Sequence, residues 1–204
     1  NPIAGLRGAI EILAVEHARE DPHFDIVQET LAQIRRLDSL VKDLLAFAKP
    51  ISLKLDSVPL HLVLEATVPF VRPSADEAGV ALSLEIPAGV PPALLDPQQI
   101  QQVIVNLLMN GIQATPPGGT VAVSARTLTG ELALAVRDTG SGIKPGDLKH
   151  IFEPFFTTQH IGTGLGLSIV QRIVSAHAGR IEVETREGGG TTFTVYLPTA
   201  AGRV

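Results

Sequence analysis

Residues 138–178 read DTGSGIKPGDLKHIFEPFFTTQHIGTGLGLSIVQRIVSAHA, with two glycine clusters separated by an aromatic segment. The second cluster, residues 162–167, continues without proline into an apolar segment of helical period, which predicts a loop that becomes a helix. The free N–H groups of a first helical turn bind anions, and glycines such as Gly164 and Gly166 let a phosphate approach the backbone. A tight connection that binds nothing is the alternative. The sequence lacks the strand context of a dinucleotide fingerprint and the lysine of a P-loop.

The first glycine cluster follows a predicted buried strand and opens with Asp138. An aspartate beside glycines that admit a flat ring can accept a hydrogen bond from an exocyclic amine such as that of adenine. The alternative is an aspartate that stabilises its own turn.

Two amides lie upstream in a predicted helix, at Asn106 and Asn110. Their spacing of four places them on one face, beside an apolar stripe at 103, 104, 107, 108 and 112. Amides inside an apolar helix are costly to bury without partners. A hydrated Mg²⁺ ion with phosphate oxygens would supply such partners.

Five segments of the sequence together resemble the motifs of one known protein family. The segments Asn106-x-x-x-Asn110, Asp138-x-Gly140-x-Gly142, 152–156 (FEPFF), 162–167 (GTGLGL) and 188–193 (GGGTTF) follow the order of the N, G1, F, G2 and G3 boxes. Together they resemble the ATP-binding domain of sensor histidine kinases, within the GHKL superfamily shared with gyrase and MutL.

The resemblance implies that ATP lies between the asparagine helix and a lid formed by the long segment between Gly142 and Gly162. It implies that Asp138 binds adenine, that Asn110 ligates Mg²⁺, and that Asn106 acts catalytically by ordering the metal's water or the phosphates. The remaining nucleotide-binding positions that it implies are Gly140, Gly142, Thr163, Gly164, Leu165, Gly166, Leu167 and Thr192. Relatives often carry a lysine where this chain has Gln159, and we expect Lys144 or Arg172 to compensate.

The N-terminal part predicts a helical hairpin, with apolar residues at helical spacing over 3–18 and again over 27–48. Two helices bury too little surface alone, so we expect a homodimer that forms a four-helix bundle. Packing on the following domain alone is the alternative. Because Pro50 disfavours continued helix, we predict a dimerisation hairpin over 1–49 and an ATP-binding domain over 50–204.

The opening Asn1-Pro2 resembles the tail of the phosphoacceptor box, whose histidine would lie four residues before Asn1. We therefore interpret the chain as a fragment that binds Mg²⁺-ATP without autophosphorylating. The resemblance gives Asn1 a role in dephosphorylating the regulator. None of the six histidines has the acceptor context; they are His17, His23, His61, His150, His160 and His177.

The predicted fold class is α+β, a helical hairpin followed by an α/β sandwich whose mixed sheet packs against three helices on one face. Strands are expected at 52–56, 81–86, 93–95, 120–127, 131–137, 180–184 and 192–197. A formal charge of −5 argues against direct nucleic-acid binding, and the absence of cysteine excludes disulfides. No apolar run has membrane-spanning length, which predicts a cytoplasmic fragment whose full-length protein could be tethered upstream.

The predicted function is the histidine kinase core of a two-component system, which phosphorylates a response-regulator receiver domain and also acts as a phosphatase. The boxes most resemble the nitrogen-regulation type of sensor kinase. Two alternatives remain: an ATP-binding dimer scaffold without kinase activity, and a serine kinase like the anti-sigma-factor relatives of the fold.

Overall fold

The computed structural model describes residues 5, 6, 8–12, 24–87, 89–158 and 162–199. The chain forms two compact units, the first from residues 1–50 and 155–165, the second from 51–154 and 166–204. In the first unit, α2 (Phe24–Ala48) is a helix of 25 residues. Residues 5, 6 and 8–12 are also helical, and the rest of the first predicted helix lies outside the described residues. The four-helix bundle stays a prediction.

The second unit contains a five-stranded sheet in the order β2-β4-β5-β7-β6. Its strands are β2 (Ala81–Glu85), β4 (Thr120–Leu128), β5 (Glu131–Asp138), β7 (Thr191–Pro198) and β6 (Arg180–Thr185). The pair β2–β4 is parallel and the other pairs are antiparallel, so the predicted mixed sheet is confirmed.

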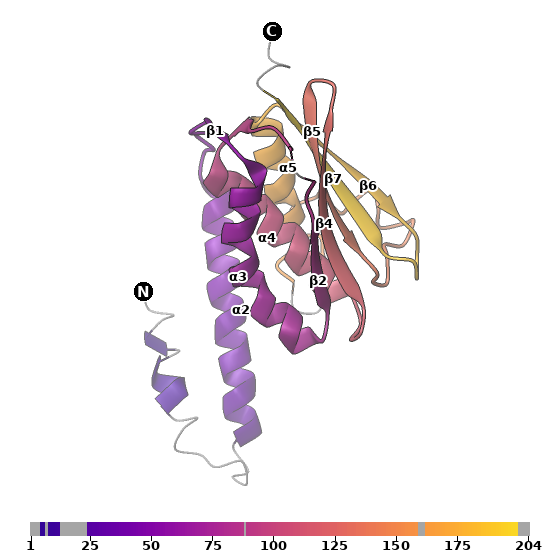
Figure 1. Ribbon diagram of the computed structural model, residues 1–204. Helices are drawn as coiled ribbons and strands as arrows, with labels where there is room; N and C mark the ends of the chain where they lie inside the picture. Colours follow the sequence, from indigo (N-terminus) through magenta and orange to yellow (C-terminus); the bar gives the residue numbers. More distant parts are fainter. Residues whose placement is uncertain (1–4, 7, 13–23, 88, 159–161, 200–204) are drawn as a thin grey trace. The chain divides into compact units, whose positions relative to one another are not determined.

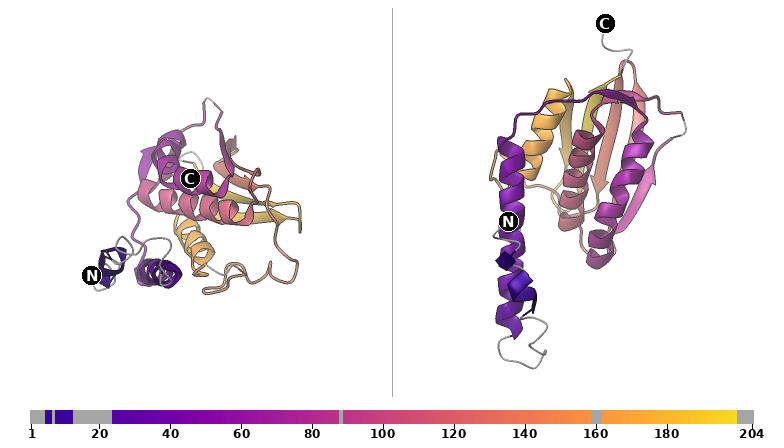
Figure 2. Two further views of the ribbon diagram at one scale, coloured as in Figure 1. Left: turned by 90° about the horizontal axis from the view of Figure 1, so that it is seen from below. Right: turned by 90° about the vertical axis from the view of Figure 1, so that its left-hand side faces the viewer.

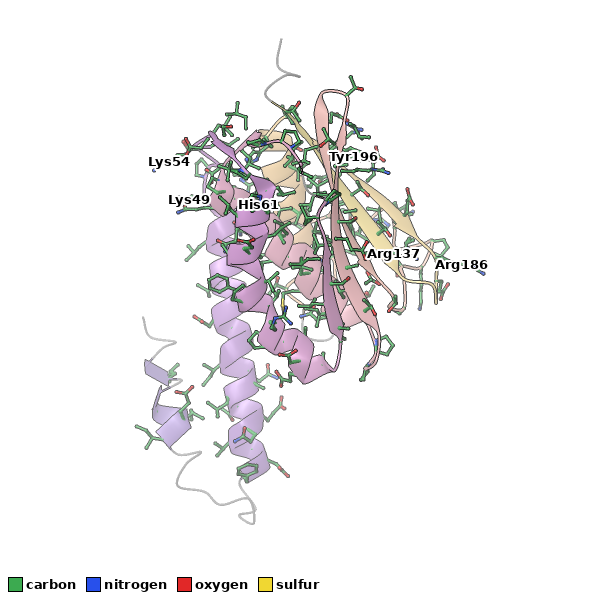
Figure 3. The ribbon with its side chains drawn as sticks, viewed as in Figure 1. Lys49, Lys54, His61, Arg137, Arg186 and Tyr196 are labelled. Atoms are coloured by element: carbon green, nitrogen blue, oxygen red, sulfur yellow. The ribbon has the colours of Figure 1, made fainter. Side chains whose placement is uncertain are left out.

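Three helices cover one face of this sheet: α3 (Leu60–Ala78), α4 (Pro97–Ala114) and α5 (Gly166–Ala176). They lie side by side against the strands (Figures 1 and 2). Strand residues that face them are apolar and buried, as in Leu134 of β5 and Val195 of β7. Arg137 and Tyr196 lie on the other face of the sheet (Figure 3), as the alternation of side chains along a strand requires.

A separate two-stranded ladder pairs β1 (Asp56–Val58) with β3 (Ala93–Leu95). The strand predicted at 52–56 is wrong, because regular pairing begins only at Asp56. Residues 51–56 alternate between half-buried and exposed, which is the pattern we read as a strand. Their backbone has another partner, since the Lys54 N–H donates to Asp96 Oδ2 at 2.9 Å.

Helix α3 contains two prolines, Pro69 and Pro73, without being interrupted. Each proline removes the hydrogen bond to the carbonyl four residues earlier, on Glu65 and Pro69 respectively. All three residues are exposed, so water can solvate these carbonyls. The helix ends at Gly79, whose φ of 65° is the left-handed conformation of a helix C-cap.

Candidate nucleotide-binding site

Asp138 is the last residue of β5, and its side chain points to the helix-covered face of the sheet. The residue is only 5 % exposed. Its Oδ1 accepts hydrogen bonds from the N–H of Gly140 at 2.9 Å and from the N–H of Thr191 at 3.1 Å. One carboxylate oxygen thus joins the turn after β5 to the start of β7.

The second oxygen of this carboxylate, Oδ2, makes no hydrogen bond to any described residue. Within that part of the chain no fully buried side-chain nitrogen or oxygen lacks a partner, so Oδ2 retains contact with solvent. Burial raises the pKa of Asp138 above its ordinary 3.8, while the Gly140 and Thr191 N–H groups act in the opposite direction. Asp138 therefore does stabilise its own turn through Oδ1, and it also keeps one oxygen open to a ligand.

The turn after Asp138 is held at both ends. The Ser141 N–H donates to the Ala114 carbonyl at the end of α4 at 3.0 Å, and a Cβ on Gly140 would collide with that same carbonyl. Gly142, with φ of +67°, lies against the Arg186 carbonyl. The sequence uses glycine at both positions because the neighbouring backbone leaves no room for a side chain.

Helix α4 begins with Asp96 as its N-cap and presents Asn106 and Asn110 on one half-buried face. Asn106 Nδ2 donates to the Gly166 carbonyl at 3.3 Å. This bond joins the asparagine helix to the first residue of α5. The Asn110 side chain makes no hydrogen bond within the described ranges, so its amide is available to a ligand.

The glycine-rich segment before α5 is split between the two units, and residues up to Leu165 belong to the first. There the Phe155 N–H donates to the Gly164 carbonyl at 2.9 Å, and the Leu165 N–H donates to Thr163 Oγ1 at 3.3 Å. Gly164 has φ of +70°. Phe155 also has a positive φ, 68°, which is unusual for a bulky residue, and it is 62 % exposed.

Residues 95–201, more than half of the 204-residue chain, match the family described as histidine kinase-, DNA gyrase B- and HSP90-like ATPases. The chain belongs to this ATPase family. The resemblance drawn from the boxes is therefore confirmed.

Two curated relatives of this chain are sensor kinases of Escherichia coli K12. It is 33 % identical over 198 residues to the sensor histidine kinase ZraS, covering 97 % of this chain and 43 % of ZraS. It is 34 % identical over 200 residues to the signal transduction histidine-protein kinase AtoS, covering 97 % of this chain and 33 % of AtoS. The ATPase chain thus spans less than half the length of these relatives.

A solved structure, full-length ShkA in complex with AMPPNP, has the same fold as this ATPase. The TM-score is 0.78 at 29 % identity, and the match covers 98 % of this chain and 44 % of ShkA. The predicted fold class of a mixed sheet with helices is confirmed by this likeness.

Two residues that the sequence analysis did not name lie next to Asp138. The Thr191 N–H donates to its carboxylate, whereas Thr192 faces the opposite side of the sheet, beside Arg137. Gly111 in α4 is the second, since a Cβ there would stand 3.4 Å from Asp138 Cβ. An isolated glycine inside an apolar helix usually marks such a close approach, so this signal was present in the sequence.

The remaining predicted positions are distributed as follows. Leu167 is half-buried in the first turn of α5, next to Gly166. Asn1, Gln159 and three of the six histidines (His17, His23 and His160) lie outside the described residues. Lys144 is exposed and Arg172 half-buried.

No group of three or more metal-ligating His, Cys, Asp or Glu residues occurs in the part of the chain that the structure describes. Within the same part, no helix is long and apolar enough to cross a membrane.

Proposed function

We propose that this chain is the ATP-binding kinase core of a two-component sensor histidine kinase. It transfers the γ-phosphoryl group of ATP to a protein histidine, from which an aspartate of a response-regulator receiver domain takes it. The observation that carries the proposal is the Asp138 carboxylate, with Oδ1 fixed by two N–H groups and Oδ2 open. The family match and the relatives named as sensor kinases support the same activity.

In the proposed site, Asp138 Oδ2 accepts the hydrogen bond of the adenine amine. Gly140 and Gly142 let the turn after Asp138 pack directly against the Ala114 and Arg186 carbonyls, which holds the carboxylate in position for the base. Thr191 keeps the carboxylate in place through its backbone N–H at 3.1 Å. Thr192, on the other face of the sheet, takes no part in this arrangement.

In this proposal the triphosphate of ATP lies between Asn110 on α4 and the start of α5. The Asn110 amide oxygen is the proposed protein ligand of Mg²⁺, which fits a side chain without a hydrogen-bond partner among the described residues. A Mg²⁺ ion held there would supply positive charge that neutralises the phosphates during phosphoryl transfer. Asn106, oriented by the Gly166 carbonyl, orders the phosphates or a metal-bound water.

The phosphate loop is assigned to Thr163, Gly164, Leu165, Gly166 and Leu167. Gly166 and Leu167 provide N–H groups at the start of α5, where a helix carries unpaired donors and the positive end of its dipole. Gly164 permits the left-handed backbone that precedes this turn.

We further propose a homodimer in which the hairpin of residues 1–49 forms a four-helix bundle, and an ATP-binding domain that spans residues 50–204. Support comes from α2, where apolar side chains at helical spacing are exposed, among them Leu37, Val41 and Leu44. The phosphatase role of Asn1 and a cytoplasmic location belong to the same proposal.

The decisive experiment combines binding with the chemistry of the phosphorylated product. Calorimetric titration of this chain with Mg²⁺-ATP tests the site, and γ-labelled ATP given to a chain extended to the length of its relatives tests transfer. Label that is labile to acid and stable to base supports histidine transfer. Acid-stable label would favour the serine kinase, and tight ATP binding without label would favour the scaffold.

A further inference from the structure

His177 lies one residue beyond the end of α5 and is only 1 % exposed. Its Nδ1 is 2.8 Å from the Ile173 carbonyl oxygen, and its Nε2 is 3.0 Å from the Asp96 backbone nitrogen. A carbonyl oxygen only accepts and a backbone N–H only donates. Nδ1 therefore carries the proton, and Nε2 accepts from Asp96.

Asp96 is the N-cap of α4, and both its side chain and its backbone make hydrogen bonds. Its Oδ1 accepts the N–H groups of Gln98 and Gln99 at 3.1 Å, and its Oδ2 accepts the N–H of Lys54 at 2.9 Å. Its carbonyl accepts the N–H of Ile100 at 2.9 Å, and its own N–H donates to His177 Nε2. One imidazole thus joins the last turn of α5 to the N-cap residue of α4.

A second bond joins the same helices at the opposite end of α5, where Asn106 donates to the Gly166 carbonyl at 3.3 Å. The two bonds lie at the two ends of an 11-residue helix. Together they define where the start of α5 lies along α4. Displacement of one helix along the other would require at least one of these bonds to break.

We propose that His177 is a positioning residue of the nucleotide site. It holds the start of α5, which offers its N–H groups to phosphate, in register with Asn106 and Asn110 on α4. This inference rests on the proposed ATP-binding function. Binding groups must be held to within a fraction of an ångström by the residues behind them, and a buried side chain bonded to both helices is suited to that task.

Two amide substitutions separate the two bonds of the imidazole. In His177→Gln the amide oxygen can reach the position of Nε2 and accept from Asp96. In His177→Asn the shorter side chain places its NH₂ near Nδ1, so only the bond to Ile173 is kept. Val80→Ala, which removes buried methyl groups next to α3, is the control for loss of stability alone.

The affinity for Mg²⁺-ATP is measured by calorimetry at a temperature where thermal unfolding shows every variant folded. His177→Gln is expected to bind within about threefold of wild type, and His177→Asn about tenfold more weakly, since a lost buried hydrogen bond costs affinity on this order. Val80→Ala should lower the melting temperature without lowering affinity. Nitrogen NMR of the wild-type imidazole should show the Nδ1–H tautomer.

Equal affinities of the Asn variant and wild type would overturn the proposal. So would an equal loss in the Gln and Asn variants, which would indicate packing alone, or an Nε2–H tautomer. If wild type itself bound no ATP, the proposed function would fall together with this inference. Binding by wild type without a Gln–Asn difference removes the inference alone.

Discussion

Asp138→Asn should weaken ATP binding strongly while leaving the fold intact. The amide oxygen of Asn can replace Oδ1 and accept from Gly140 and Thr191, which directs the NH₂ group to the position of Oδ2. There it would face the adenine amine, so a donor meets a donor. Hydrogen bonds to charged groups contribute about 1.5–3 kcal/mol, and we therefore expect affinity to fall about 10- to 150-fold.

The stability of the protein should not fall together with the ATP affinity in Asp138→Asn. Burial raises the pKa of Asp138 above 3.8, so its stabilising contribution is complete below pH 3.8 and is lost as pH rises through the folded-state pKa. At neutral pH the uncharged Asn side chain avoids the desolvation cost that burial imposes on the charged carboxylate. The free energy of unfolding of Asp138→Asn should therefore equal or exceed that of wild type.

The assay pairs calorimetric titration with Mg²⁺-ATP and urea unfolding on the same samples. Glu65→Gln, which neutralises an exposed carboxylate on α3, is the matched control and should change neither quantity. Unchanged ATP affinity in Asp138→Asn would refute the assignment of Oδ2 to the adenine amine. Lost affinity accompanied by unfolding would show that the carboxylate acts only on the turn.

Three further predictions follow from the structure. Asn110→Ala should remove most of the magnesium dependence of nucleotide binding and leave metal-free binding nearly unchanged; a wild-type response to magnesium in calorimetry would place the ligand elsewhere. Wild-type ATP affinity should fall as pH is lowered through the raised pKa of Asp138, a trend that pH-dependent titration should not find in Asp138→Asn. Ala178→Gly should stabilise the protein by about 1 kcal/mol in urea unfolding, since Ala178 has φ of 57°, and unchanged stability would mean that this turn is not strained.

The sequence predicted most of the second unit because its signals are local. Asp96-Pro97 marked the start of α4, alternating residues marked β4 and β5, and the glycines marked where the backbone is crowded. Asp138 was named as a candidate for the same reason, since a charged residue that ends a buried strand is conspicuous.

The features that the sequence did not indicate depend on interaction partners that are distant in sequence. Side chains alternate with period two, so a strand predicted to begin at 192 instead of Thr191 did not indicate which threonine lies on the face of Asp138. Alternation over 52–56 indicated burial but could not show that Lys54 bonds a side chain instead of a strand. His177 gave no sign of its partner Asp96, which precedes it by 81 residues.

The two prolines of α3 have a consequence for the motions of the second unit. Pro69 and Pro73 carry no amide proton, and the carbonyls of Glu65 and Pro69 lose their helical donors, so the backbone ladder of the helix is interrupted twice along one exposed face. The inner face still packs through Val68, Val71 and Ala75. Hydrogen exchange should therefore divide α3 into a slowly exchanging first half and a second half that opens independently of global unfolding.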